Sequence, residues 1–247
     1  MGPRKFFLAA ILSLISGMAG AADLRVMSSN AMREALRELV PQFESASRHK
    51  VAMTFIGSAD IMKRLRAGEG GVDVVILQAS SVDELAADGK VVPGSRVDFA
   101  RSMIGVAVRA GAPRPDIRSG EALKRALLAS KSIIISSGPS GIYLSGLFER
   151  MGIPREKVVQ SKPGTQSGEV VARGEADIGF QQVSELLPVK GIDYLGPLPP
   201  DIQHVTVFSG GILAAAAAPQ AARELMNFLA SPAAAPALRR KGMEPAL

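Results

Sequence analysis

The sequence contains no cysteine and no tryptophan, and its only histidines are His49 and His204. Without cysteine there can be no disulfide, thiolate zinc site, iron–sulfur cluster or cysteine nucleophile. Two histidines are too few for a multi-histidine metal site, so we expect neither a bound metal nor another cofactor. Aromatic residues make up only 4% of the chain, which leaves little surface for stacking single-stranded nucleic acid.

Several motifs of nucleotide binding and hydrolysis are missing as well. No G-x-G-x-x-G follows the first expected strand, and no G-x-x-x-x-G-K-[ST] loop occurs in the chain. The G-x-S-x-G elbow of serine hydrolases is also absent. These absences argue against dinucleotide-binding, P-loop and serine-hydrolase functions.

Charge is mildly positive and evenly spread. The net charge of the 247-residue chain is +6, and most of its basic residues are scattered. The dense cluster Arg239-Arg240-Lys241 is typical of a solvated helix end, where cations interact favourably with the helix dipole. We therefore expect no nucleic-acid partner, and a field of this sign suits a small anionic ligand.

The N-terminal segment has the features of an export signal. Arg4 and Lys5 precede an apolar run over residues 6–15, and small residues follow. The tripeptide Ala19-Gly20-Ala21 fits the small-x-small cleavage rule of secretory signal peptides, and the apolar run is short for a membrane span. We expect residues 1–22 to be a cleaved signal peptide and the mature chain to be a periplasmic monomer.

Apolar runs and helical periodicities alternate along the rest of the chain. The first hundred residues indicate three strand–helix units, and a second series of such units begins near residue 133. Nearly continuous apolar strands are typical of buried parallel sheets. We expect strands at residues 24–27, 51–55, 72–77, 103–108, 133–135, 158–159, 178–181, 205–208 and 212–217.

Two such series in tandem predict an α/β protein with two lobes, mainly parallel sheets and a hinge. We expect lobe 1 to comprise residues 23–101 and 196–247, and lobe 2 to comprise residues 102–195. Two connections then cross the hinge. Small ligands bind such folds in the cleft between lobes, at the carboxyl ends of the strands.

Two residues outside the strands carry specific expectations. Pro41 lies in the first helical pattern, residues 32–43, and its ring and missing N–H should kink the last turn or end the helix. His49 lies in the polar turn after that helix, so we expect it to be solvated.

Three strand-to-helix turns carry small hydroxyl residues: Ser28-Ser29, Gly57-Ser58, and residues 136–141. A helix start offers unpaired N–H donors and about half a positive charge. Several such starts that converge on one cleft would bind an anion without lysine. The alternative is that each serine only caps its own helix.

The order of these segments resembles the periplasmic molybdate-binding proteins of ABC transporters, which have the type 2 periplasmic-binding-protein fold. The resemblance covers essentially the whole mature chain. Its segments are residues 28–32, 55–58, 72–76, 140–143 and 173–179.

The resemblance implies that a tetrahedral oxyanion is held by neutral donors. The implied ligand-binding residues are Ser28 or Ser29, Ser58, Ser140 with the amide of Gly141, and Gly164 or Thr165, with Gln182 where the family has a tyrosine. The first loop looks about two residues shorter than in the family. Both departures alter the size of the cavity and the geometry of its donors.

Three other segments look more like a divergent branch of the same fold that includes aconitate isomerase: residues 92–97, 104–113 and 181–188. An enzyme of that kind moves an allylic proton and needs a base beside its ligand. The candidates are Tyr143, His204, which precedes a strand near the hinge, and Glu169. A tricarboxylate also favours a fixed cation, for which Arg101 and Lys162 are candidates.

Two functions therefore stay open at this point. The first is an exported solute-binding protein that closes on a small anion, a molybdate-like oxyanion or a small carboxylate, and delivers it to an ABC transporter permease. The alternative is a periplasmic aconitate isomerase that interconverts trans- and cis-aconitate in the same cleft. A third possibility, a periplasmic sensor or chaperone module, predicts no small-molecule ligand.

Overall fold

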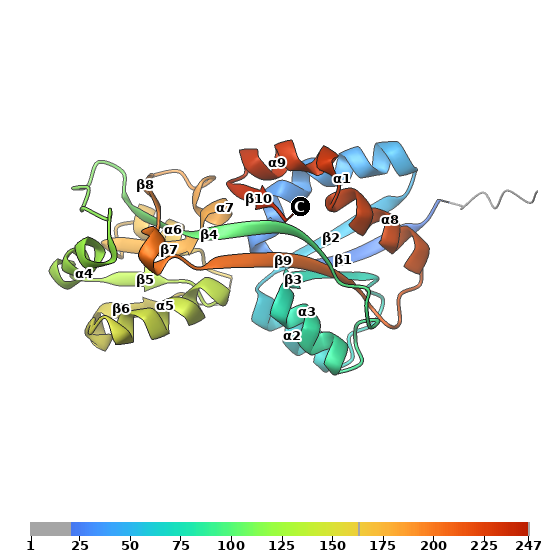
Figure 1. Ribbon diagram of the computed structural model, residues 1–247, viewed down its shortest axis with the longest axis horizontal. Helices are drawn as coiled ribbons and strands as arrows, with labels where there is room; N and C mark the ends of the chain where they lie inside the picture. The colour runs from blue at the N-terminus through green and yellow to red at the C-terminus, as the bar shows by residue number, and fades with distance from the viewer. Residues whose placement is uncertain (1–20, 163, 247) are drawn as a thin grey trace, which may run out of the picture.

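The computed structural model describes residues 21–162 and 164–246. The expected signal peptide, residues 1–22, lies almost wholly outside the described residues. Two halves of the molecule, lobe 1 and lobe 2, are joined by two long strands that run side by side between them (Figure 1). These strands are β4, Val97–Arg109, and β9, Val205–Ile212.

Lobe 1 holds the N-terminal strands and the C-terminal helices. A core of leucine, methionine and phenylalanine side chains packs helices α1, α8 and α9 against one face of the sheet, and a second core packs α2 and α3 against the other. The elements are β1 Asp23–Ser29, α1 Arg33–Ser47, β2 Lys50–Ile56, α2 Ser58–Arg66, β3 Val74–Gln78, α3 Ala79–Ala87, α8 Pro219–Leu229, α9 Ala235–Arg240 and β10 Met243–Pro245, with the short 3-10 helices η1 Asn30–Met32 and η4 Pro232–Ala234.

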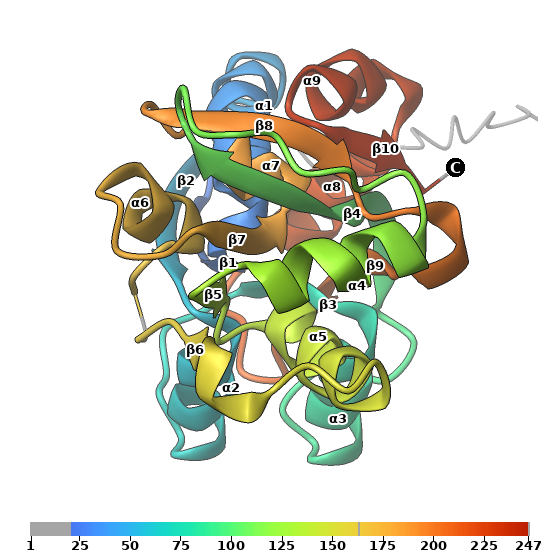
Figure 2. The ribbon, with the colours of Figure 1, turned by 90° about the vertical axis from the view of Figure 1, so that its left-hand side faces the viewer.

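Lobe 2 is built on the same plan. In the end-on view its strands β4, β7, β5 and β6 follow one another, with α6 on one side and α4 and α5 on the other (Figure 2). The elements are α4 Gly120–Ala129, β5 Ile133–Ile135, α5 Pro139–Arg150, β6 Val158–Gln160, α6 Ser167–Ala172, β7 Ile178–Gln182, α7 Val183–Leu186 and β8 Ile192–Pro197, with the 3-10 helices η2 Arg155–Lys157 and η3 Pro200–Ile202.

The strand order is β2-β1-β3-β9-β4 in lobe 1 and continues as β4-β7-β5-β6 into lobe 2. Strand β1 pairs in parallel with β2 and β3 in lobe 1, and β5 pairs in parallel with β6 and β7 in lobe 2, as the sequence indicates. The two crossing strands pair antiparallel with their neighbours. The expectation of mainly parallel sheets is therefore wrong for the molecule as a whole, whose sheet is mixed.

Strand β4 is about twice as long as the sequence indicated. Its first half mixes polar and apolar residues and lacks the continuous apolar run from which the second half was predicted. It pairs with β9 up to Met103 and with β7 from Ile104 onward. We therefore propose that the hinge lies at this point of the strand. The chain returns from lobe 2 to lobe 1 after Leu198, whose side chain packs in the core of lobe 2. We therefore propose that the second boundary between the lobes lies at Leu198 and not at residue 196.

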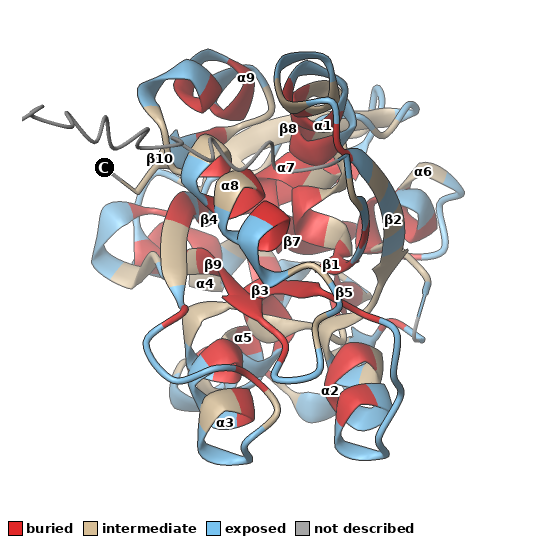
Figure 3. Cartoon of the chain, turned by 90° about the vertical axis from the view of Figure 1, so that its right-hand side faces the viewer, coloured by how far each residue is buried: buried red, intermediate tan, exposed pale blue. Residues whose placement is uncertain are grey.

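The expected strands at residues 205–208 and 212–217 are one strand, β9, followed by a turn. Gly210 and Gly211 do not break it. A Cβ at Gly211 would lie 2.8 Å from Val91 and 2.9 Å from Val82, so the glycine lets α3 and its loop pack directly on the strand. Strand β3 is buried from Val74 to Leu77 and β9 from Phe208 to Ile212 in this part of lobe 1 (Figure 3).

Two local expectations are wrong. Helix α1 runs on to Ser47 through Pro41, which sits on the exposed face, where water can satisfy the carbonyl group that lacks a helical partner. His49 is buried, with 3% of its surface exposed, because its Nδ1 accepts the Ala22 N–H and its Nε2 lies 3.1 Å from a Glu224 carboxylate oxygen.

None of the helices in the described part of the chain is long and apolar enough to cross a membrane.

Candidate functional site

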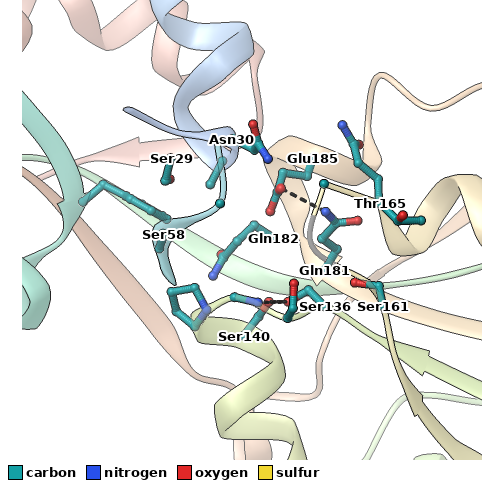
Figure 4. Close-up of a pocket in the computed structure, with 18 residues that line it drawn as sticks. Ser29, Asn30, Ser58, Ser136, Ser140, Ser161, Thr165, Gln181, Gln182 and Glu185 are labelled. Atoms are coloured by element: carbon teal, nitrogen blue, oxygen red, sulfur yellow. Dashed lines mark hydrogen bonds between the residues drawn. The ribbon is translucent and has the colours of Figure 1, made fainter. Parts of the chain in front are cut away.

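A small pocket lies where the carboxyl ends of the strands of both lobes face each other, with a cavity volume of about 50 Å³. Figure 4 shows Ser29, Asn30 and Ser58 reaching it from lobe 1, and Ser136, Ser140 and Ser161 from lobe 2. All three serine-bearing turns expected from the sequence therefore meet in one place. The further wall residues are Ala31, Gly57, Ser137, Gly138, Pro139, Gly164, Thr165, Gln166, Gln181, Gln182, Glu185 and Phe208.

The first turn offers Ser29 and not Ser28. Successive residues of a strand point to opposite faces, and Ser28 is fully buried, with its hydroxyl group donating to the carbonyl oxygen of Ser29. Ser29 ends β1 and lines the pocket. Its hydroxyl oxygen is buried and has no hydrogen-bond partner in the described part of the chain.

The second turn places Ser58 at the first position of α2, a helix of nine residues, with Gly57 as the N-cap. Both residues line the pocket. The N-terminal end of α2 therefore points its free N–H groups and its partial positive charge toward this cavity.

The third turn holds a pair of hydroxyl groups at the start of α5. The Oγ atoms of Ser136 and Ser140 lie 2.8 Å apart, and the Gly138 N–H donates to Ser136. The expected role of the Gly141 amide is not supported, because Gly141 lies off the pocket wall and its N–H donates to the carbonyl oxygen of Gly138. A Cβ at Gly141 would lie 1.7 Å from the carbonyl oxygen of Ser136, so its function is to let this turn close tightly.

The loop between β6 and α6 supplies Ser161 and Thr165. Thr165 lines the pocket, as expected from the sequence. Its backbone amide donates to the carbonyl oxygen of Lys162. Ser161 was not expected. It follows β6 directly, so the rule that ligands bind at strand carboxyl ends could have identified it. Its buried hydroxyl group has no partner among the described residues.

Gln182 occupies the centre of the wall, between the two groups of serines (Figure 4). It is buried, and its amide nitrogen donates to the hydroxyl group of Thr206 on β9. Its carbonyl oxygen Oε1 has no donor within residues 21–162 and 164–246. Leaving a buried polar group without a hydrogen bond costs about 1–3 kcal/mol. The unpartnered atoms of Ser29, Ser161 and Gln182 therefore favour binding of a polar ligand that forms hydrogen bonds with them.

Glu185 was not among the expected site residues, although it lies in the segment 181–188 that resembles the aconitate isomerase branch. It is the only titratable side chain on the pocket wall among the residues that the structure describes. Burial of its carboxyl group raises the pKa of Glu185 to about 7, against the opposing effects of a hydrogen bond from Gln181 (2.9 Å) and the positive charge of Arg33.

The residues expected to transfer a proton lie elsewhere. Tyr143 and His204 stack on each other with ring centres 4.7 Å apart, and the Tyr143 hydroxyl group donates to the carbonyl oxygen of Ile202. Glu169 is exposed on α6 and lines a neighbouring groove. The expected cations Arg101 and Lys162 are exposed and do not line the pocket.

Apart from Glu185, the polar groups of the pocket wall are neutral donors and helix starts, a set that suits an anion. Within the described residues no lysine or arginine lines it. Hydroxyl groups from both lobes and the N-terminal ends of α2 and α5 supply the positive potential.

A profile of the bacterial extracellular solute-binding proteins matches residues 24–244. The chain belongs to this family. Among curated relatives of this solute-binding protein, an aconitate isomerase from Pseudomonas sp is 40% identical over 230 residues, which cover 90% of this chain and 87% of the relative.

Solved structures confirm the two-lobed periplasmic-binding-protein fold and the likeness to molybdate-binding proteins. The periplasmic molybdate-binding protein of Azotobacter vinelandii has a TM-score of 0.74 and 21% identity, covering 89% of this chain and 98% of that one. The sulfate-binding protein SubI from Mycobacterium tuberculosis H37Rv has a TM-score of 0.75 and 18% identity, covering 91% and 87%. At these identities the likeness concerns the fold alone.

Proposed function

We propose that this protein is a periplasmic isomerase that binds trans- or cis-aconitate between its lobes and moves an allylic proton. The observation that carries the proposal is Glu185, a carboxyl group with a pKa near 7 on the wall of a pocket otherwise lined by neutral donors. The 40% identity with an aconitate isomerase over nine-tenths of the chain supports it.

A carboxyl group with a pKa near 7 can take up and release a proton at neutral pH. Its carboxylate form would repel a bound oxyanion, so Glu185 suits proton transfer better than anion transport. A general base is most effective when its pKa lies near the working pH. Glu185 fits that role, and it faces the same cavity as the serines that would hold the ligand.

The reaction needs no cofactor. The C–H bond of the aconitate methylene carbon breaks and its proton passes to the Glu185 carboxylate, while the electron pair shifts the double bond by one carbon. The same carboxyl group then returns a proton to the far carbon, so atoms and electrons balance. Negative charge that develops on the ligand's carboxylate oxygens is stabilised by donors already in place, including Ser29 and Ser161.

A second function, binding of a small anion as cargo for an ABC importer, is favoured by the neutral donor set and by the shared fold with molybdate- and sulfate-binding proteins. It predicts tight binding without turnover. The two functions therefore differ in one measurable property, the conversion of trans-aconitate to cis-aconitate.

The test is to incubate the purified protein and its E185Q variant with trans-aconitate and follow cis-aconitate by proton NMR. Wild-type turnover that falls at least a hundredfold in E185Q, with affinity retained, supports the isomerase. The matched control is E156Q, which removes an exposed carboxylate outside both the pocket and the neighbouring groove and leaves the rate unchanged. Binding without turnover by the wild type supports the carrier, and full turnover by E185Q removes Glu185 as the base.

A further inference from the structure

A larger groove adjoins the pocket and shares three wall residues with it: Asn30, Gln166 and Glu185. Its cavity volume is about 480 Å³, against about 50 Å³ for the pocket. The pocket alone offers little room for a ligand with several carboxylate groups, and the groove begins at the wall residues that the two cavities share, Glu185 among them.

The two cavities differ in charge. Four cations line the groove, Arg33, Arg37, Arg173 and Lys190, together with the carboxyl groups of Glu34, Glu169 and Glu185. Two of the arginines are engaged, since Arg37 forms an ion pair with Glu34 (3.0 Å) and Arg173 with Glu175 (2.7 Å). Of the other two cations, Arg33 contacts Asn30, a residue that also lines the pocket.

Arg33 is held in place but is not neutralised. It is the first residue of α1, its Nη2 donates to the side-chain oxygen of Asn30 at 2.6 Å, and its guanidinium carbon lies 5.6 Å from the ring centre of Phe55. Its Nε is buried and has no hydrogen-bond partner, and no ion pair of Arg33 occurs within the described ranges. Its positive charge lowers the pKa of Glu185 against the effect of burial, so the two groups are electrostatically coupled.

A buried guanidinium N–H without an acceptor is costly, and the planar group matches a carboxylate in geometry. We propose that the groove is a second subsite of the binding site, in which Arg33 binds a carboxylate group of a ligand whose other end lies among the serines of the pocket. The ligand class is therefore a polycarboxylate, and Arg33 distinguishes it from a tetrahedral oxyanion or a monocarboxylate. This inference rests on the proposed function for its choice of ligand.

The experiment compares affinities for trans-aconitate, with three carboxylate groups, and crotonate, with one, by isothermal titration calorimetry. We expect R33Q to weaken trans-aconitate binding at least tenfold and to leave crotonate binding unchanged, while R33K recovers part of the loss. The matched control is R118Q, which removes an exposed arginine paired with Asp116 outside the pocket and the groove and should change neither affinity appreciably. Circular dichroism melts of each variant verify folding.

The outcomes separate this inference from the proposed function. If R33Q binds trans-aconitate as tightly as the wild type, or loses both ligands equally, the Arg33 subsite is refuted whatever the wild-type turnover. If trans-aconitate binding depends on Arg33 but the wild type does not convert it, the subsite stands and the isomerase is refuted. A wild type that binds no carboxylate overturns both.

Discussion

At the scale of the residue, the site depends on which of two neighbours faces the cavity. Ser28 and Ser29 are chemically identical, and only the register of β1 decides that Ser29 lines the pocket while Ser28 faces the protein. The sequence shows both serines at the end of a strand but does not show where the strand's alternation ends. Glu185 could not be predicted for a related reason: nothing in the sequence around it shows that this carboxyl group is buried against the pocket.

Removing the Ser29 hydroxyl group should weaken ligand binding. The buried Oγ has no protein partner, so its hydrogen bond is available to the ligand, and S29A should lose about 1–3 kcal/mol of binding free energy. The control is S28A, whose hydroxyl group is satisfied inside the protein. Titration calorimetry with trans-aconitate measures both, and equal affinities for S29A and S28A would exclude Ser29 from the site.

Glu185 predicts a pH dependence of both rate and stability. The carboxylate is the base, so kcat/KM for trans-aconitate should rise with pH through about 7. Because the folded pKa lies above the unfolded value of 4.5, the folded state binds more protons between these values, and its stability falls as pH rises from about 4.5 to 7.

The free energy of unfolding should show the same dependence. E185Q should be more stable than the wild type at pH 8, by at most about 3 kcal/mol, and about as stable at pH 4.5. Urea unfolding at the two pH values measures the difference. The same stability gap at both values would contradict the buried, proton-binding carboxyl group.

At the scale of the element, the strand-to-helix turns were predictable and the crossing strands were not. Serine and glycine between an apolar strand and a helical pattern mark the turns at Ser29, Ser58 and Ser140, because helix starts need caps and strand ends need breaks. Strand β4 reaches from one lobe to the other through a polar stretch around Asp98 and Arg101. Its pairing partners, not its own composition, make it a strand.

The tight start of α5 gives a prediction at this scale. G141A would place a Cβ 1.7 Å from the carbonyl oxygen of Ser136, so the turn must open and separate Ser136 from Ser140. We expect a loss of about 1–3 kcal/mol in stability, as for other overpacked sites, and weaker ligand binding. The control is G146A at a half-buried position of the same helix, where the nearest contact of a Cβ is a flexible arginine side chain at 3.3 Å. Thermal melts that show no difference between the two variants would contradict the close packing.

At the scale of the whole molecule, the two lobes share a sheet and touch across the pocket. The Ser184 hydroxyl group of α7 in lobe 2 donates to the carbonyl oxygen of Ala31 in lobe 1 at 2.8 Å, and both residues are buried. Together with the change of pairing partner between Met103 and Ile104 on β4, this contact indicates a closed arrangement that hinge motion can open. The two series of strand–helix units in the sequence predicted the two lobes. The contacts between the lobes could not be predicted, because they depend on three-dimensional packing.

Removing this contact should shift the equilibrium toward the open form. S184A loses about 1 kcal/mol of closed-state stability, which is roughly a fivefold shift in the ratio of closed to open protein. Small-angle X-ray scattering without ligand should give a larger radius of gyration for S184A, and affinity should fall correspondingly. The control is S45A, whose hydroxyl group also donates to a backbone carbonyl but within α1. Identical scattering curves for the two variants would contradict a stabilising role of the Ser184–Ala31 hydrogen bond in the closed form.

The most direct test of the central claim is a crystal structure of the E185Q variant with trans-aconitate. We predict that one carboxylate group lies within hydrogen-bond distance of Ser29 and Ser161, that the methylene carbon lies beside the side chain of residue 185, and that a second carboxylate group meets Arg33. A ligand bound outside the space between the lobes, or one held there with residue 185 turned away from its methylene carbon, would contradict the account.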